Sequence, residues 1–400
     1  MRQSIVISSM GSISPLGASS EEALEAYRSP ASCIRYQDLN GCLTPVAPLN
    51  ERAETCLNQL RQEKDLYQRL DRTVAMAIYA SRLAIARSGW DLPRHIGINI
   101  GSSRGATMLF ETFHDFFLKH AHNRVPALTS PLTTLGNLSS WVAQDLQSDG
   151  VTISHSVTCS TALHGLVNAM AWLRSGMADR FLVGGTEAPL TPFTVAQMKA
   201  LRIYSDRREG EYPSRPLAED ASQNSMVLGE GAAAFCLTKG GANPGTREHE
   251  PLAIIASVGY ANEKLSHGAS LSEDGECLYD SMKMALEGFD GTPPVDAIVL
   301  HAPGTVKGDR AELAAVQRLF GDHLPYLVSN KWKIGHTLGA SGAFSLELAI
   351  LMLQHQIRLP FPYAALPNTD PGELRTVMVN ASGFGGNAAS VILRRPAVRR

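Results

Sequence analysis

The sequence predicts an α/β protein, because short apolar segments that end in glycine or proline alternate along the chain with segments of helical periodicity. A length of 400 residues, of which 44% are hydrophobic and 18% charged, is enough for one large core or for two fused domains. The formal net charge of -2 gives a nucleic-acid or anionic-membrane partner no general electrostatic support. Composition and charge together indicate a soluble globular protein.

The chain opens with a predicted strand and then a helix. Residues 4–17 are mostly apolar until glycines and a proline stop the run, and the residues after them begin with serines and glutamates, as helix starts do. Residues 69–89 place apolar side chains at helical spacing and end at a glycine, and a strand is predicted over 95–103. This order is typical of βαβ units.

Further strands are predicted at 181–189 and 296–305, and 378–395 contains two strands around a glycine turn. Residues 239–251 are rich in glycine and proline, which makes them a candidate linker or internal boundary. Each half of the chain ends in strands that flank small residues. This similarity hints at a duplication that the sequence alone does not establish.

The cysteines bear on metal binding and on the cellular compartment. They are scattered and include no CxxC pair, which argues against a zinc site and against a disulfide framework. A reducing cytoplasm is the expected location. The N-terminal apolar run is too short for a signal peptide, and no later stretch approaches about 20 uninterrupted apolar residues. The cysteines are Cys33, Cys42, Cys56, Cys159, Cys236 and Cys277.

Cys159, in the stretch TCSTALHG, is the first candidate catalytic residue. A free cysteine is often a buried packing residue, and that interpretation stays open when Cys159 is viewed alone. Its surroundings favour a nucleophile, because it follows β-forming residues and precedes a helix predicted from about Ala162 to Arg174. The start of that helix favours a thiolate, and N–H groups of the turn can face a developing oxyanion.

Two histidines are further candidates. His301 is predicted at the C-terminal edge of a strand, where open α/β sheets place their sites, although a hydrogen-bonded structural histidine fits the same position. His336 follows a glycine and precedes a helix of small residues, where a bulky ring is otherwise unexpected. Lys331 and Glu312 are by default solvated charges, and GFGG at 383–386 is by default a hairpin turn.

Taken in order, these stretches resemble the motifs of elongating-type β-ketoacyl-ACP synthases, within the thiolase superfamily. The match covers nearly the whole chain, and the ordered series is far more specific than any single piece. The matching stretches are ISSMGSISPLG, TCSTALHG, VGGTEAPLTP, SRPLAEDASQNSMVLGEGAAAFCL, HAPGTVKGDRAE, KWKIGHTLGASGA and NASGFGGNAAS.

The resemblance implies a thiolase-like fold, in which duplicated βαβ halves form a five-layered αβαβα arrangement. It divides the chain into an N-terminal half, residues 1–250 with the nucleophile, and a C-terminal half, residues 251–400 with both histidines. The implied partners are an acyl carrier protein and a second subunit, which is an identical copy, a related synthase or a chain-length factor.

The resemblance also implies the chemistry. Cys159 would accept an acyl group from acyl-ACP while its own N–H and that of Phe384 hold the oxyanion. The two histidines would stabilise the enolate that malonyl-ACP leaves on decarboxylation, and the enolate carbon would attack the acyl-cysteine. No metal or redox cofactor is required, since the substrates are carried on the phosphopantetheine of the carrier protein. The implied roles are Cys159, His301 and His336 as the catalytic triad, Lys331 and Glu312 as supporting residues, and Phe384 as the gate beside the acyl pocket.

Departures from the family pattern affect the substrate contacts. Pro303 and Ala269 stand where related enzymes carry threonines that bond the pantetheine arm, so Thr305 and Ser270 become the candidates for holding it. Met198 stands where a phenylalanine of the acyl pocket is common. Carrier docking is expected at Arg69, in the 69–89 helix, and at Lys199, Arg202 and Arg207, although an ordinary solvated basic surface has the same composition.

Competing interpretations differ in single residues. A degradative thiolase needs a second reactive cysteine in the closing glycine loop, and the stretch GFGGNAAS contains none. An initiating synthase or plant-type polyketide synthase carries asparagine where this chain has His336. Both classes are therefore disfavoured. The serious alternative is a non-catalytic subunit that only shapes the acyl tunnel, as chain-length factors do, but those lack the cysteine. Primary fatty-acid elongation and a specialised pathway stay open, and the altered arm contacts favour a polyketide or an aryl-polyene pathway.

Overall fold

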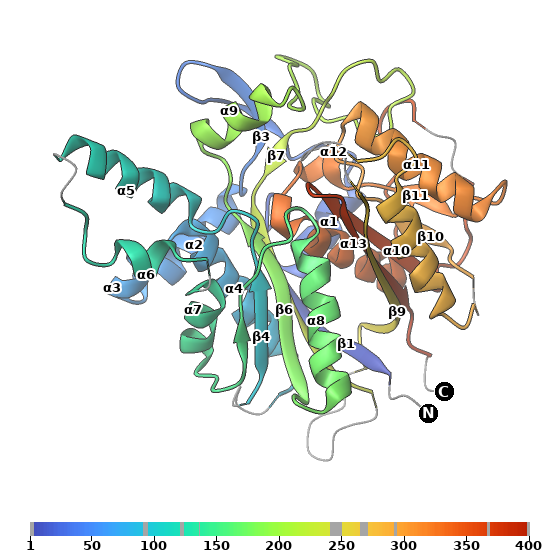
Figure 1. Ribbon diagram of the computed structural model, residues 1–400, viewed down its shortest axis with the longest axis horizontal. Coiled ribbons are helices and arrows are strands. Elements are labelled where there is room, and N and C mark those ends of the chain that lie inside the picture. Colours follow the sequence, from blue (N-terminus) through green and yellow to red (C-terminus); the bar gives the residue numbers. More distant parts are fainter. Residues whose placement is uncertain are drawn as a thin grey trace.

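A mixed ten-stranded sheet runs through the protein, as the computed structural model shows for residues 4–90, 95–120, 124–135, 137–240, 250–264, 271–291, 294–365 and 369–397 (Figure 1). Its strands are β1 (Ile5–Ile13), β4 (Gly97–Gly101), β5 (Thr152–Ile153), β6 (Arg180–Glu187), β8 (Gly231–Lys239), β9 (Ala253–Asn262), β10 (Ala297–Val299), β11 (Tyr326–Val328), β12 (Thr376–Gly383) and β13 (Asn387–Arg394). A small second sheet contains β2 (Arg35–Asp38), β3 (Leu43–Ala47) and β7 (Leu228–Gly229).

The large sheet consists of two halves with the same topology. The order β5-β4-β6-β8-β1 in one half corresponds to β11-β10-β12-β13-β9 in the other. In each half the first three strands are parallel and the last two are antiparallel to their neighbours. The halves join where β1 pairs with β9, over three residue pairs that begin with Ile5 and Ile255. The duplication at which the sequence hinted is therefore present in the strand order.

The helices complete the layers. Helices α4 and α7 pack on the outer face of the first half-sheet, α10 and α11 pack on the outer face of the second, and α8 and α13 lie between the two halves. This is the predicted five-layered αβαβα arrangement. The helices are α1 (Ser20–Arg28), α2 (Glu51–Gln62), α3 (Asp65–Gln68), α4 (Arg72–Arg87), α5 (Thr107–Lys119), α6 (Thr129–Thr133), α7 (Asn137–Leu146), α8 (Thr161–Ser175), α9 (Pro192–Ala200), α10 (Glu276–Glu287), α11 (Val306–Phe320), α12 (Lys331–Ile334) and α13 (Ser341–His355).

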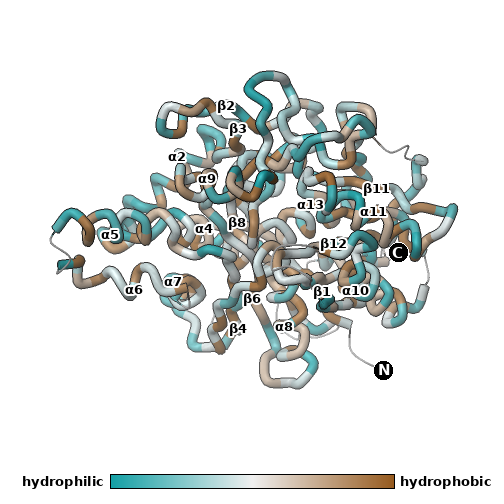
Figure 2. The backbone as a smooth tube through the Cα atoms, turned by 45° about the horizontal axis from the view of Figure 1, so that its top comes forward, coloured by the Kyte–Doolittle hydropathy of each residue, from teal (hydrophilic) through white to brown (hydrophobic). Residues whose placement is uncertain are grey.

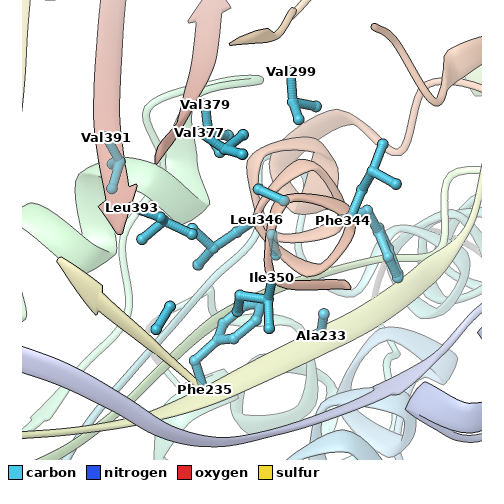
Figure 3. Close-up of a cluster of buried hydrophobic side chains, with 14 of the residues drawn as sticks. Ala233, Phe235, Val299, Phe344, Leu346, Ile350, Val377, Val379, Val391 and Leu393 are labelled. Carbon is cyan, nitrogen blue, oxygen red and sulfur yellow. The ribbon is translucent and has the colours of Figure 1, made fainter. Parts of the chain in front are cut away.

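The central helix α13 explains why the two halves hold together. Its residues from Ser341 to Leu353 are buried, and Phe344, Leu346 and Ile350 pack between side chains of β8 on one side and of β10, β12 and β13 on the other (Figure 3). A helix that is apolar on every face needs such a position between two sheets. The layers therefore fix the ends of α8 and α13, where the candidate catalytic residues lie.

Most predicted elements are present, with one displaced boundary that affects a candidate site residue. The helix predicted over 69–89 begins at Arg72, because Asp71 accepts a hydrogen bond from the N–H of Thr73 and so caps it. Arg69 therefore lies outside that helix, directly after α3. Among the described residues, no helix is both long enough and apolar enough to cross a membrane.

Candidate active site

The turn that carries Cys159 lies between β5 and α8, where the sequence predicted it. Thr158 has a φ of 47°, in the left-handed region, and α8 begins two residues after Cys159. Gly383 packs against this turn so closely that a Cβ atom there would lie 1.9 Å from Thr158 Oγ1 and 2.9 Å from the Cys159 nitrogen. Only glycine therefore fits at position 383, and the β12–β13 hairpin contacts the nucleophile turn directly.

The hairpin loop is fixed in place by three hydrogen bonds. Thr158 Oγ1 donates to the Phe384 carbonyl at 3.1 Å, and Asn387 Nδ2 donates to the same oxygen at 2.9 Å. Ser160 donates to the Asn387 side-chain oxygen. The GFGG stretch is thus the expected hairpin turn, and it is also held beside Cys159, with the Phe384 side chain 38% exposed.

His301 and His336 come together from different segments, one after β10 and the other after α12. Their ring centroids lie 5.2 Å apart at an interplanar angle of 86°. Burial, the neighbouring imidazole and Lys331 lower the pKa of His301 well below its ordinary value, and burial with Lys331 lowers the pKa of His336 to about 3. Both rings are therefore neutral near pH 7, and among the described residues neither buried Nδ1 atom has a hydrogen-bond partner.

Lys331 is buried beside the histidines with neutral hydrogen-bond partners. Its Nζ donates to Asn330 Oδ1 at 2.9 Å and to Ser345 Oγ at 3.2 Å. Burial lowers the pKa of Lys331 to about 8, while Glu312 acts in the opposite direction. The default interpretation of Lys331 and Glu312 as a solvated pair does not hold, since both side chains are buried.

Glu312 holds the His301 loop. One carboxylate oxygen accepts from the His301 N–H at 2.9 Å and from Asn380 Nδ2 at 3.1 Å, and the other accepts from the Ala302 N–H at 2.7 Å. Asp309 supports the same loop, because it accepts from the N–H groups of residues 304 and 305 at 3.1 and 3.2 Å. Burial raises the pKa of Asp309 to about 7. Neither Asp309 nor Asn380 was predicted from the sequence as a site residue.

The expected stabilisation of a Cys159 thiolate is not found. Burial and the carboxylate of Glu187 raise the pKa of the Cys159 thiol to about 12, and Lys331 opposes them. Burial removes the sulfur from water, and the resulting rise in pKa outweighs the lowering expected from the N-terminal end of α8. In this closed site Cys159 is a neutral thiol.

Glu187 was missed by the sequence analysis. It lies at the end of β6 and accepts hydrogen bonds from Ser102 Oγ at 2.8 Å, from the Ser103 N–H at 2.8 Å and from the Gly339 N–H at 2.9 Å. It therefore ties the loop after β4 to the segment that follows His336. The sequence feature that could have identified Glu187 is a charged residue at the end of an apolar strand.

An apolar cluster adjoins the thiol. Cys159 is 8% exposed and shares this cluster with Met198, so the structure brings the predicted pocket residue to the predicted nucleophile. The other buried members are Val195, Tyr204, Met226, Leu228 and Leu338.

Of the two residues predicted to hold the pantetheine arm, the structure describes Thr305 but not Ser270. Thr305 is half-buried directly before α11, and its side chain makes no capping hydrogen bond to that helix. Ser270 and Ala269 lie outside the described residues.

The predicted docking residues do not all lie together. Lys199 is in α9, where its Nζ donates to Thr44 Oγ1 at 3.2 Å, and the exposed Arg202 and Arg207 follow the same helix. Arg69 is exposed next to α3, which Figure 1 draws at the lower left, away from α9 at the top.

Comparisons with known proteins agree with this geometry. Residues 2–242 match the family described as β-ketoacyl synthase, N-terminal domain. The chain belongs to the β-ketoacyl synthase family. Residues 252–362 match the C-terminal domain of the same family.

Individual relatives cover most or all of this β-ketoacyl synthase. A granaticin polyketide β-ketoacyl synthase 1 from Streptomyces violaceoruber is 31% identical over 362 residues, which are 82% of this chain and 83% of the relative. A 3-oxoacyl-[acyl-carrier-protein] synthase 2 from Coxiella burnetii is 28% identical and covers 98% of this chain and 99% of the relative. A solved structure of the ishigamide ketosynthase/chain length factor has a TM-score of 0.85 at 22% identity, over 99% of this chain and 100% of that one.

Proposed function

We propose that this β-ketoacyl synthase catalyses a decarboxylative Claisen condensation, in which an acyl group on Cys159 is joined to malonyl-ACP to give a 3-oxoacyl-ACP. The observation that carries the proposal is the pairing of two buried, neutral histidines, together with a buried cysteine and a buried Lys331 that acts electrostatically on all three, with residues from both halves of the fold. The family membership and the names of the relatives support the same reaction.

The first step transfers the acyl group. The Cys159 sulfur attacks the thioester carbonyl, the bond to the carrier sulfur breaks, and the proton of the thiol ends on the departing carrier thiol. Because the pKa of the free thiol is about 12, the proton has to leave as the sulfur attacks, and it passes to the departing carrier sulfur. The N–H groups of Cys159 and Phe384 hold the oxyanion, and Phe384 gates the acyl pocket.

The second step forms the carbon–carbon bond. Malonyl-ACP loses carbon dioxide, and the electron pair of the broken bond passes to an enolate whose oxygen accepts hydrogen bonds from ring N–H groups of His301 and His336. The enolate carbon attacks the acyl-cysteine and releases the Cys159 thiolate, which is then reprotonated. Neutral imidazoles suit this role, because each keeps one N–H donor. Lys331 and Glu312 keep the two histidines and their loops in place.

In this proposal the substrate contacts and the chemistry need only side chains and backbone N–H groups of the protein. Met198 faces the acyl chain, and Thr305 with Ser270 holds the pantetheine arm. No metal or redox cofactor takes part, so condensation in the presence of a strong chelator is expected to proceed at the unchanged rate.

The partners are an acyl carrier protein and a second subunit. The name of the Coxiella relative supports the carrier, and Lys199, Arg202 and Arg207 form the basic surface for it, with Arg69 at a separate position. Helix α5 extends from the main body, as Figure 2 shows. Apolar side chains of this helix and of residues 124–128 are exposed. We assign this surface to a second copy or to a related synthase or chain-length factor. Its exposed residues are Met108, Phe110, Leu118, Val125 and Leu128.

The proposal also covers the location of the protein in the cell, the division of the chain into halves and the pathway. All six cysteines are free, which supports the reducing cytoplasm. The two halves divide between residues 250 and 251. The chain acts in fatty-acid, polyketide or aryl-polyene elongation, and the name of the Streptomyces relative supports the polyketide class.

The alternative is a non-catalytic subunit of a synthase heterodimer, and one experiment separates the two. The purified protein is incubated with acyl-ACP, and the mass of the Cys159 peptide is measured. The proposal predicts an added acyl group, which Cys159→Ala loses while its circular dichroism spectrum is unchanged. An unmodified wild-type peptide would favour the non-catalytic subunit.

A further inference from the structure

Helix α12 carries Lys331 into the active site, yet it has only four residues, from Lys331 to Ile334. A helix of this length is not stable without tertiary contacts, because its nucleation is unfavourable and it has few internal hydrogen bonds. The same helix ends two residues before His336. Whatever holds α12 therefore sets the positions of two active-site residues.

The contacts that hold α12 come from the other end of the chain, from Tyr27 in α1 to Cys33. The N–H of Cys33 donates to the Lys333 carbonyl at 2.9 Å, and Ser32 Oγ donates to the Trp332 carbonyl at 3.0 Å. We call these seven residues the 27–33 segment. It satisfies two carbonyl groups of α12, which a four-residue helix leaves free.

Asn330 connects the 27–33 segment to the active-site lysine. Its Nδ2 donates to the hydroxyl of Tyr27 at 3.3 Å, and its Oδ1 accepts from Lys331 Nζ at 2.9 Å. Because Lys331 Nζ can only donate, it selects the amide orientation with the oxygen toward Lys331, and the NH2 group then faces the Tyr27 hydroxyl. The Tyr27 hydroxyl thus acts on Lys331 through a single side chain.

Lys333 makes the firmest link. Its side chain is buried, and its Nζ donates to the carbonyls of Ser29 and Ala31 at 2.6 Å each. Ser29 follows the last residue of α1, where the partial negative charge of the helix end favours a cation. Burying an ammonium group has a desolvation cost that a methionine of similar length would avoid. Tight packing alone therefore does not account for a lysine at this position.

We propose that Lys333 is a positioning residue, which locks α12 to the 27–33 segment so that Lys331 stays directed at the histidines and Cys159. The role assigned to Lys331 rests on the proposed condensing function. The sequence motif KWKIGH drew attention to Lys331 alone, and the second lysine of the motif faces the opposite side of α12, toward the 27–33 segment.

Three variants test the proposal: Lys333→Met, Ser32→Ala and Tyr27→Phe. Lys239→Met, which removes a lysine near the end of β8, is the control. The first readout is kcat and KM for carbon dioxide release from malonyl-ACP. We expect Lys333→Met to lower kcat about tenfold with KM unchanged, because a small displacement of a positioned group has effects of this order. Ser32→Ala and Tyr27→Phe should each lower kcat to a smaller extent.

The second readout is alkylation of Cys159 by iodoacetamide, followed by mass spectrometry on the Cys159 peptide at several pH values. Below its pKa of about 8, Lys331 is positively charged and favours the Cys159 thiolate, so displacement of Lys331 should slow alkylation in the part of the profile below pH 8. A residue with a purely structural role would lower the melting temperature and leave this profile unchanged.

The proposal is overturned if the folded variants match Lys239→Met in both kcat and alkylation profile, whatever their melting temperatures. Should Lys333→Met fail to fold, Ser32→Ala and Tyr27→Phe decide by the same two criteria. Failure of the proposed function is distinguishable, because the wild-type protein itself would then release no carbon dioxide. The alkylation profiles would still report on the positioning of Lys331.

Discussion

Replacing Glu312 by glutamine is expected to disorganise the loop that carries His301. Both carboxylate oxygens are acceptors, one from the His301 N–H at 2.9 Å and the other from the Ala302 N–H at 2.7 Å. A glutamine side chain offers one acceptor oxygen, and its NH2 group only donates. In either orientation of the amide, one of the two backbone N–H groups would face another donor.

The size of the effect follows from these contacts. Losing one hydrogen bond to a charged group removes about 1.5–3 kcal/mol, and a buried N–H left without an acceptor adds a penalty of similar size. We therefore expect the free energy of unfolding to fall by about 3 kcal/mol or more in urea titrations. Displacement of His301 should lower kcat for carbon dioxide release about 100-fold.

Glu273→Gln, at an exposed position, is the control and should change stability by less than about 0.5 kcal/mol. If Glu312→Gln has the same urea midpoint and the same kcat as the wild type, the two carboxylate oxygens of Glu312 do not position His301.

Two further variants test other parts of the site, and a third tests Glu347, a buried carboxyl group in α13. Thr305→Val should lower kcat/KM for acyl-ACP about tenfold, because one hydroxyl contact is worth up to about 1.4 kcal/mol. Since the Thr305 hydroxyl makes no capping bond to α11, the melting temperature should hardly change. A lower melting temperature with unaltered kinetics would contradict the role of Thr305 in holding the pantetheine arm. Arg202→Glu should weaken carrier binding more at low salt than at high salt, and an unchanged KM for acyl-ACP at low salt would exclude this surface. Burial raises the pKa of Glu347 from 4.5 to about 7, so the folded protein binds this proton more tightly than the unfolded chain does, and the free energy of unfolding should fall as pH rises through this range. Because Asp309 contributes a decrease of the same sign, urea titrations at about pH 5 and pH 7.5 should show a smaller decrease for Glu347→Gln than for the wild type, and an equal decrease in both proteins would disprove the prediction.

Local sequence signals located the parts of the site that lie within one segment. The cysteine turn before α8, the strand end before His301 and the glycine hairpin at 383–386 all appear where turn residues and periodicity placed them. The start of α4 was misplaced by three residues, because periodicity does not show where a cap such as Asp71 stops the helix. Arg69 was assigned to the wrong element for this reason.

The parts that the sequence did not reveal depend on contacts between distant segments. The pKa of Cys159 is raised because side chains from several segments exclude water, and no local pattern reports that burial. The same holds for Glu187, whose partners come from the loop after β4 and from the segment after His336, and for Lys333, whose partners lie about 300 residues earlier in the chain. Glu187 and Lys333 could have been noticed as charges inside or at the end of an apolar run.

Carbon dioxide release by Cys159→Gln tests the central claim most directly, namely that two neutral histidines stabilise an enolate. The glutamine variant cannot form an acyl-enzyme, but it retains both histidines. The account predicts that this variant releases carbon dioxide from malonyl-ACP and that adding His336→Ala or His301→Ala abolishes the release. Absence of release from Cys159→Gln, or release that persists in both double variants, would contradict the account.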